Sequence, residues 1–360
     1  MQENDYEKKL AHFKALIDAD LIEYTAILKG RWSKDYDETS QQIFAAYLDI
    51  LARGGKRLRG VLAMCAYEMG GGEDEELNIR AARIIEMIHA YLLVMDDIAD
   101  RSHLRRGGPT AQIILSDLHK ANGWFGDSAH FGVSQAMNAA LAALHIIMQE
   151  VAELPVQDTY KLEAQIVLNR GLTKTVVGQI NDINNQVIQE VGEKEIIEMM
   201  TRKTAYYSFV NPLEFGLVLA GKDFAEFVWL EDWAINMGLS YQIQDDILGI
   251  FGDDSISGKS ALDDVREGKL TLLVARALSH VAESDKKIIL DALARDTITD
   301  AELEKIKEIM QTSGVLQYTL GLSEQYAKKA IAALSRSPEI YTNTSTFLAH
   351  FTRAMLKRNK

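Results

Sequence analysis

Apolar residues recur at three- and four-residue spacing along most of the chain, which is the spacing of one face of an α-helix. Near the N-terminus this pattern includes Leu10, Phe13, Leu16 and Ile17. It returns over residues 79–98, 134–151, 159–189, 194–219, 224–250 and 268–283 and continues toward the C-terminus. No convincing alternation of apolar and polar residues lies between these segments. The pattern therefore predicts an all-α protein.

Glycine and asparagine interrupt the periodic segments at residues 70–72, 122–123, 192, 221 and 252–258. None of these breaks is long enough for an interdomain linker, and the chain has no fixed-period repeat. We therefore expect one domain covering residues 1–360. Pro212 lies inside a periodic segment and is expected to kink that helix.

Composition narrows the possible functions. The hydrophobic fraction of 47% and the charged fraction of 25% are ordinary for a globular protein. A net charge of −13 argues against nucleic acid as a partner, because phosphate backbones bind basic surfaces. Cys65 is the single cysteine, which excludes an intramolecular disulfide and favours the cytoplasm. The polar N-terminus and the short apolar stretch around residues 139–148 predict neither a signal peptide nor a membrane span.

Three aspartates end an apolar helical segment over residues 84–95: Asp96, Asp97 and Asp100. Residues four apart share a helix face, so Asp96 and Asp100 project together, while Asp97 lies about 100° round the helix. Two such carboxylates repel each other unless a cation neutralises them, and Mg²⁺ suits hard oxygen ligands with room for phosphate and water. The alternative is a solvated acidic helix end, which the helix macrodipole disfavours.

A second acidic cluster follows on the apolar segment that contains Gln242, Asp245 and Asp246. Gln242 lies three residues before Asp245 and four before Asp246, so its amide and a carboxylate can face one ligand. One pair of aspartates is ordinary on a helix surface. Two pairs, each ending an apolar helix, favour a metal site.

Basic residues cluster twice beside flexible glycines. Lys56, Arg57 and Arg59 follow Gly54-Gly55, and Arg105-Arg106 precede Gly107-Gly108. Guanidinium groups grip diphosphate oxygens in a bidentate manner, and lysine adds a point charge. A basic run by itself is usually a solvated surface. Its combination with paired aspartates favours a diphosphate site.

Together these residues resemble the trans-prenyl diphosphate synthases, a family that includes farnesyl and geranylgeranyl diphosphate synthases. The resemblance covers residues 54–273 in the family's order: GGKRLRG, EMIHAYLLVMDDIADRSHLRRGGPT, Gly178-Gln179, Lys203-Thr204, YQIQDDILGIFGD, GKS and REGKLTLL. Gly60 stands where the family commonly has proline, and this departure affects only the expected rigidity of that loop. Gly249 replaces the last aspartate of the second DDxxD, and the resulting DDILG resembles the archaeal-type branch.

The resemblance implies the isoprenoid synthase fold, a helical bundle around a deep central cavity with the two acidic motifs facing each other across its mouth. It implies an enzyme in which about three Mg²⁺ ions, held by Asp96, Asp100 and Asp245 with Asp97 in the same motif, stabilise the departing pyrophosphate. The allylic diphosphate would be held by Arg105, Lys203, Lys259 and Lys269. Isopentenyl diphosphate would be held by Lys56, Arg59, His89 and Arg106. Thr204 and Gln242 would direct oxygen dipoles at the developing allylic cation.

Tyr91 bears on product length, because it precedes Asp96 by five residues, or about 7.5 Å of helix rise. A ring there can limit a chain that grows along this helix; the alternative is that Tyr91 is only a core aromatic. With Leu92 not aromatic, the resemblance favours geranylgeranyl diphosphate (C20), then farnesyl diphosphate (C15) or a longer product. A homodimer is also implied. The alternatives are a class I terpene cyclase, which needs no second diphosphate site, and a noncatalytic regulatory subunit, which usually lacks the acidic motifs.

Overall fold

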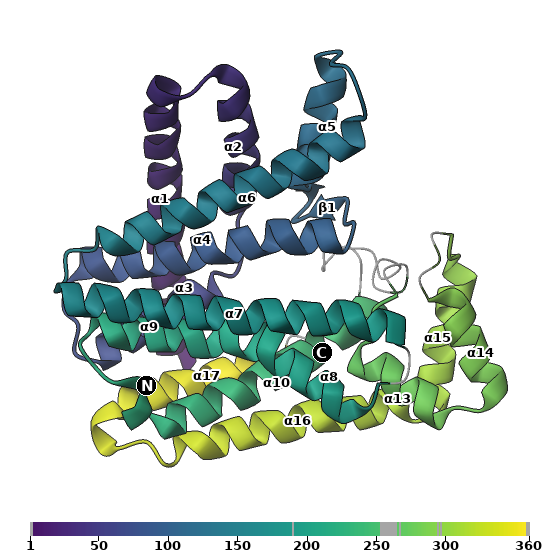
Figure 1. Cartoon of the computed structure of the whole chain (residues 1–360). Coiled ribbons are helices and arrows are strands. Elements are labelled where there is room, and N and C mark those ends of the chain that lie inside the picture. Colours follow the sequence, from purple (N-terminus) through teal and green to yellow (C-terminus); the bar gives the residue numbers. More distant parts are fainter. Residues whose placement is uncertain are drawn as a thin grey trace. The chain divides into compact units, whose positions relative to one another are not determined.

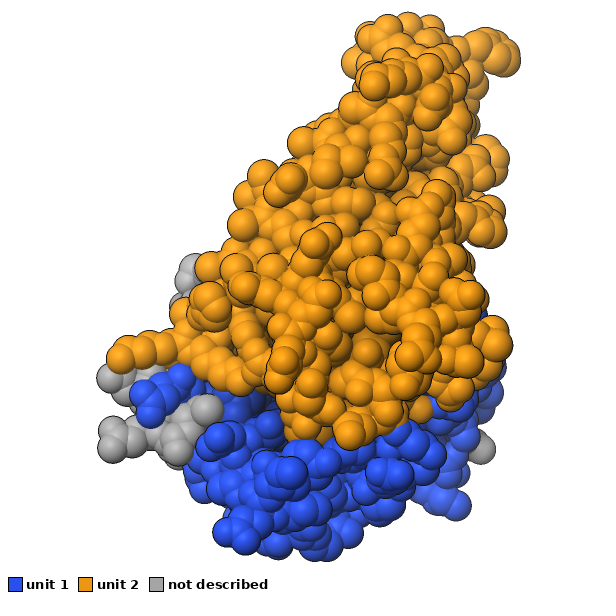
Figure 2. Space-filling view, turned by 90° about the vertical axis from the view of Figure 1, so that its left-hand side faces the viewer, with its two compact units in different colours: residues 1–6, 167–211, 223–360 blue, residues 7–166, 212–222 orange. Residues whose placement is uncertain are grey.

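The computed structural model describes residues 3–188, 191–252, 265, 268–293, 295 and 297–357. Within these residues the regular structure is helical, apart from one hairpin of two short strands (Figure 1). This confirms the predicted all-α class. Contacts divide the chain into two compact units: unit 1 comprises residues 1–6, 167–211 and 223–360, and unit 2 comprises residues 7–166 and 212–222 (Figure 2). The single domain stays a prediction.

Unit 2 contains most of the N-terminal half of the chain. Its elements are α1 (Glu3–Asp35, from residue 7), α2 (Glu38–Ala52), α3 (Leu58–Met69), α4 (Glu75–Ala99), β1 (Leu104–Arg105), β2 (Gly108–Pro109), α5 (Ala111–Ala121), α6 (Ser128–Ala152), the start of α7 (Asp158–Ile188) and most of α9 (Asn211–Leu219). Helix α4 packs against α2, α3 and α6. Tyr47 on α2 is fully buried, and its hydroxyl donates to the Met87 carbonyl at 2.9 Å, which fixes α2 against α4.

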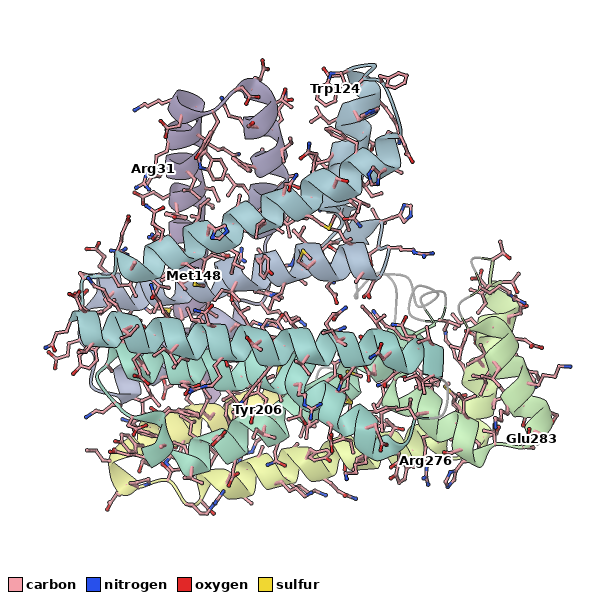
Figure 3. All side chains as sticks on the ribbon, in the orientation of Figure 1. Arg31, Trp124, Met148, Tyr206, Arg276 and Glu283 are labelled. Carbon is pink, nitrogen blue, oxygen red and sulfur yellow. The ribbon has the colours of Figure 1, made fainter. Side chains whose placement is uncertain are left out.

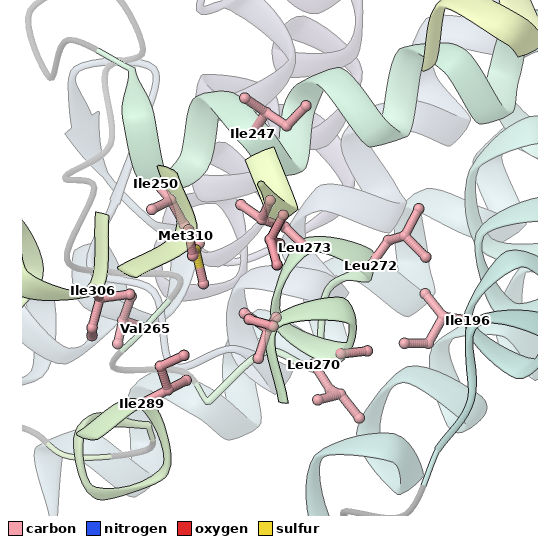
Figure 4. Close-up of a cluster of buried hydrophobic side chains, with 14 of the residues drawn as sticks. Ile196, Ile247, Ile250, Val265, Leu270, Leu272, Leu273, Ile289, Ile306 and Met310 are labelled. Atoms are coloured by element: carbon pink, nitrogen blue, oxygen red, sulfur yellow. The ribbon is translucent and has the colours of Figure 1, made fainter. Parts of the chain in front are cut away.

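Unit 1 is organised around α10 (Val228–Phe251), which packs against α13 (Leu272–His280), α16 (Val315–Leu334) and α17 (Thr342–Lys357). Its other elements are the rest of α7, α8 (Glu193–Met200), the π-helix η1 (Thr201–Val210), η2 (Phe224–Glu226), α14 (Glu283–Ala292), α15 (Asp300–Thr312) and η3 (Glu339–Tyr341). Buried aliphatic side chains of α8, α10 and α13 to α15 form one core cluster (Figure 4). Trp233 on α10 anchors a second group of rings, because Phe209 and Phe351 meet it edge-on.

Two expectations about single helices can be compared with the structure. The segment around Pro212 changes helix type, since the π-helix η1 ends at Val210 and α9 begins at Asn211. Helix α6 is long and apolar enough, by length and composition, to cross a membrane, although core helices of water-soluble proteins meet the same criterion. The absence of a membrane span therefore stays a prediction.

Candidate active site

The β1–β2 hairpin carries the second basic cluster of unit 2. Leu104 pairs with Pro109 and Arg105 with Gly108, so Arg106 and Gly107 form a two-residue turn. Both turn residues have positive φ, 53° for Arg106 and 74° for Gly107, which is the type I′ geometry of tight hairpins. The hairpin therefore points two consecutive arginines in different directions from one fixed turn.

His89 on α4 lies between two of the predicted diphosphate ligands. Its Nε2 is 3.3 Å from Nη1 of Arg59 and 3.3 Å from Nη2 of Arg106. Because guanidinium nitrogens only donate, Nε2 acts as acceptor and the ring proton belongs on Nδ1. Burial, together with the charges of Arg59, Arg106 and Arg105, lowers the pKa of His89 well below its ordinary value. A neutral imidazole thus joins two cations that the sequence motif had placed in separate segments.

Arg106 lies in partly buried, cationic surroundings. Burial lowers the pKa of Arg106, and the neighbouring charge of Arg57 lowers it further. The Arg106 side chain is held in place by carbonyl oxygens, with Nη1 donating to Arg53 at 3.0 Å. Lys56, the remaining predicted ligand of isopentenyl diphosphate, is exposed on the loop before α3. An incoming anion would relieve the repulsion among these side chains.

The aspartates at the end of α4 have different surroundings. Asp97 is fully buried and receives two hydrogen bonds from Arg105, of which the one from Nε measures 2.8 Å. Although burial opposes the charge, Asp97 and then Asp96 raise the pKa of Arg105. Asp97 therefore anchors Arg105 and compensates its charge within the protein. Arg105 Nη2 also approaches Asp96 Oδ2 at 3.4 Å.

Asp96 and Asp100 stand one helical turn apart at the end of α4, with Asp96 partly exposed and Asp100 buried. Asp100 keeps a helical backbone, and its N–H donates to the Asp96 carbonyl at 2.8 Å, so the two carboxylates share one face. Within the described residues, no set of three or more acidic, histidine or cysteine side chains gathers as a metal cage. Mg²⁺ commonly binds through one or two carboxylates and completes its shell with phosphate oxygens and water. The residues present fit this ion.

The predicted residues of unit 1 form a hydrogen-bonded chain between η1 and α10. The Thr204 hydroxyl donates to Gln242 Oε1 at 2.7 Å, and Gln242 Nε2 donates to Asp246 Oδ1 at 2.7 Å. This chain fixes which way the Gln242 amide points. Asp245 is exposed beside it on α10.

Lys203 is positioned by a residue that the sequence reasoning missed. Its Nζ donates to Asp182 Oδ2 at 2.5 Å, and Asp182 is buried on α7. A Cβ at Gly178 would lie 2.4 Å from the backbone nitrogen of Lys203, so only glycine permits this approach of α7 to η1. Further along η1, Tyr206, which Figure 3 labels, lies beneath the Lys174 ammonium of α7, whose Nζ is 3.6 Å from the ring centroid. Asp182 follows Gly178 by one helical turn, and that spacing is the signal that could have identified it.

The remaining predicted residues are less informative. Lys269 is partly buried just before α13, after Gly268 with φ of 70°. Lys259 lies outside the described residues. Tyr91 is partly buried on α4, and burial raises its pKa. The site residues divide between unit 2 and unit 1, so the facing of the two acidic motifs stays a prediction.

Comparison with known proteins identifies the class to which this fold and these motifs belong. A family model described as polyprenyl synthetase matches residues 40–310, and the chain therefore belongs to the polyprenyl synthetase family. This confirms the resemblance found in the motifs and the prediction of a prenyl diphosphate synthase.

Particular relatives refine the comparison. The geranylgeranyl diphosphate synthase of Saccharolobus solfataricus is 31% identical over 327 residues, covering 91% of this chain and 91% of the relative. The geranylfarnesyl diphosphate synthase of Aeropyrum pernix is 29% identical over 86% of this chain and 92% of its own. A solved geranylgeranyl pyrophosphate synthase of Corynebacterium glutamicum, complexed with isoprenyl diphosphate and magnesium, superposes with a TM-score of 0.90 at 25% identity over 96% of this chain and 98% of its own.

Proposed function

We propose that this protein is a Mg²⁺-dependent synthase that condenses isopentenyl diphosphate with allylic diphosphates, mainly to geranylgeranyl diphosphate. One observation supports the proposal: α4 carries both a cationic cluster, which could bind a diphosphate directly, and a carboxylate pair, which could bind one through Mg²⁺. His89 and its arginines offer cations without a metal, and seven residues later Asp96 begins a carboxylate pair. Seven residues rise about 10.5 Å along a helix, which is a suitable spacing for two diphosphate substrates that react with each other.

The side chains have distinct roles in this proposal. Magnesium bound by Asp96, Asp100 and Asp245 would supply positive charge to the departing pyrophosphate. Lys203 and Arg105, with Lys259 and Lys269, bind the allylic diphosphate. Lys203 arrives in a defined position because Asp182 orients its ammonium group. We propose about three ions per site, as the resemblance implies.

The second substrate, isopentenyl diphosphate, binds to the cations around His89. Arg59 and Arg106 donate to its diphosphate oxygens while both remain bridged by the imidazole, and Lys56 adds charge from the loop. Because Arg59 and Arg106 are already held by His89, their binding to the diphosphate costs little side-chain entropy. Thr204 and Gln242 turn oxygen atoms toward the cation that develops on the allylic partner, and the released pyrophosphate accepts the proton lost at the end.

Purified protein incubated with labelled isopentenyl diphosphate and dimethylallyl, geranyl or farnesyl diphosphate tests this function. Prenyl transfer that EDTA abolishes and excess Mg²⁺ restores supports it. Cyclic hydrocarbons released from geranylgeranyl diphosphate would indicate the terpene cyclase instead. Absence of both activities, with activity appearing only beside a second protein, would indicate a regulatory subunit. A cytoplasmic location agrees with the soluble, charged substrates.

Product length is tested at Tyr91. The relatives named above make C20 and longer products by name, and a ring five residues before Asp96 can end chain growth at C20. Tyr91→Ala should extend the dephosphorylated products beyond the wild-type limit, as measured by reversed-phase chromatography. Tyr91→Phe, which keeps the ring, is the control and should leave the distribution unchanged. An unaltered distribution in Tyr91→Ala would remove this residue from the argument.

A further inference from the structure

Arg57 differs from the other basic residues of its loop, because it points into the protein. Its side chain is 2% exposed, whereas Lys56 is exposed and Arg59 is partly exposed. Its backbone has φ of 51° and ψ of 28°, a left-handed conformation that is unfavourable for arginine. Such a backbone persists only where surrounding contacts hold it, so Arg57 must be held in place by its contacts.

The guanidinium group of Arg57 reaches three separate elements. Its Nη1 donates to Glu86 Oε2 on α4 at 3.2 Å, and its Nε donates to Asp18 Oδ1 on α1 at 2.8 Å. Its Nη2 donates to the Leu51 carbonyl at the end of α2 at 3.1 Å. The fork geometry of arginine allows one side chain to join all three. The loop that carries Lys56 is thereby fixed to α1, α2 and α4 at one point.

Glu86 completes the arrangement from the opposite side. Its carboxylate is 2% exposed, and Oε1 accepts the Gly60 N–H at 3.0 Å while Oε2 accepts from Arg57. Gly60 is the third residue of α3, and Arg57 at the N-cap position makes no side-chain cap. Glu86 therefore caps α3 from another helix, where a negative charge also suits the macrodipole. Glu86 precedes His89 by three residues on the same helix.

We propose that Arg57, Glu86 and the Gly60 N–H form a buried clamp that sets the positions of Lys56 and Arg59 for isopentenyl diphosphate. The inference rests on the proposed function and makes Glu86 a positioning residue that does not touch substrate. The clamp links the loop and the start of α3 to the part of α4 that carries His89. Lys56 and Arg59 flank Arg57 directly, so any displacement of Arg57 moves both.

The identity of residue 60 follows from the clamp. Proline has no N–H and cannot donate to Glu86, whereas glycine can. A Cβ at this position would lie 2.9 Å from the terminal methyl of Ile17 and 3.2 Å from Cγ of Glu86. Glycine thus supplies both the donor and the space. The departure from proline noted in the sequence is explained by the hydrogen bond to Glu86.

Glu86→Gln tests the clamp, because its amide keeps one acceptor but turns a donor toward either Arg57 or Gly60. We expect KM for isopentenyl diphosphate to rise about tenfold, with the allylic KM and kcat within about twofold. The matched control is Glu150→Gln, another buried carboxylate of unit 2, which lies 3.4 Å from Arg83 of α4. It should lower thermal stability while leaving both KM values unchanged. A fall in kcat together with an equal rise in both KM values in Glu86→Gln would overturn the clamp.

A second pair of variants keeps the test valid if Glu86→Gln does not fold. Gly60→Ala adds a methyl group and retains the N–H, whereas Gly60→Pro removes the N–H. The proline variant should bind isopentenyl diphosphate at least several-fold more weakly than the alanine variant in calorimetry without allylic substrate. Equal binding by the two variants would also overturn the clamp. Failure of the wild-type protein to bind or convert isopentenyl diphosphate would instead contradict the proposed function.

Discussion

His89 illustrates how one side chain can organise charges that it does not neutralise. Its Nε2 accepts from Arg59 and Arg106 at equal distances of 3.3 Å, so protonation would place three positive groups together. The neutral form is therefore required for the cluster to stay assembled before substrate binds. The motif HAYLLVMDD predicts that His89 shares a face with Asp96, but neither spacing nor composition indicates that it bridges two arginines.

This arrangement predicts a pH dependence of stability. The pKa of His89 lies well below its ordinary 6.5 in the folded protein, so protonation favours the unfolded chain. Stability from this residue is present above about pH 6.5 and is lost as the pH falls, by at most about 2 kcal/mol at pH 5. Urea unfolding of the wild type and His89→Gln at pH 8 and pH 5 measures the difference. Identical losses in the two proteins would contradict the assignment.

Asp96 and Asp97 are adjacent in sequence but should respond differently to substitution. Asp96→Ala removes a partly exposed carboxylate of the metal pair, so kcat should fall more than a hundredfold, or about 3 kcal/mol, with little change in stability. Asp97→Ala leaves Arg105 with reduced compensation in a buried site and should cost about 3 kcal/mol of stability. Thermal unfolding and steady-state kinetics of both variants separate the two effects. A stable but inactive Asp97→Ala protein would reverse the roles.

At the scale of elements, the contact of α7 with η1 is the one that positions Lys203. Gly178→Ala would place a Cβ 2.4 Å from the backbone nitrogen of Lys203, so the two helices must move apart. We expect KM for the allylic diphosphate to rise about tenfold, because Lys203 would lose its alignment with Asp182. Gly321→Ala on α16 is the control, since nothing lies within 4 Å of a Cβ there. Kinetics with each substrate varied in turn provide the measurement.

The elements themselves were largely predictable, and the hairpin was not. Apolar periodicity predicted the long helices, because each helix buries one face and its buried residues therefore recur at three- and four-residue spacing. The β1–β2 hairpin has strands of two residues each, too short for any alternation. The sequence signal for its turn was Gly107, because the second central position of a type I′ turn favours glycine. Arg106-Gly107 was interpreted only as part of the basic motif. Asp182 could have been found from its spacing to Gly178, whereas the clamp depends on contacts between distant segments, which no local pattern contains.

For the whole molecule, the homodimer stays a prediction that α6 allows us to test. Met137 and Leu141 lie four residues apart on one face of α6 and are 42% and 54% exposed. If a second copy covers this face, Leu141→Glu should shift the sedimentation coefficient from dimer to monomer. Ile340→Glu on η3, a more exposed apolar position at 83%, is the matched control and should leave the dimer intact. A monomeric wild type would refute the prediction.

The π-helix η1 has a consequence for insertions and deletions. Its hydrogen bonds span five residues, as the Asn211 N–H bonded to the Tyr206 carbonyl shows, so each turn holds one residue more than an α-helical turn. Removing a single residue between Thr204 and Val210 would let the segment relax into an α-helix of nearly the same length. The residues beyond the deletion would then keep nearly their present direction, because an α-helical turn closes with one residue fewer. Loss of one residue is therefore better tolerated in η1 than in an ordinary α-helix, where it rotates all later residues by about 100°.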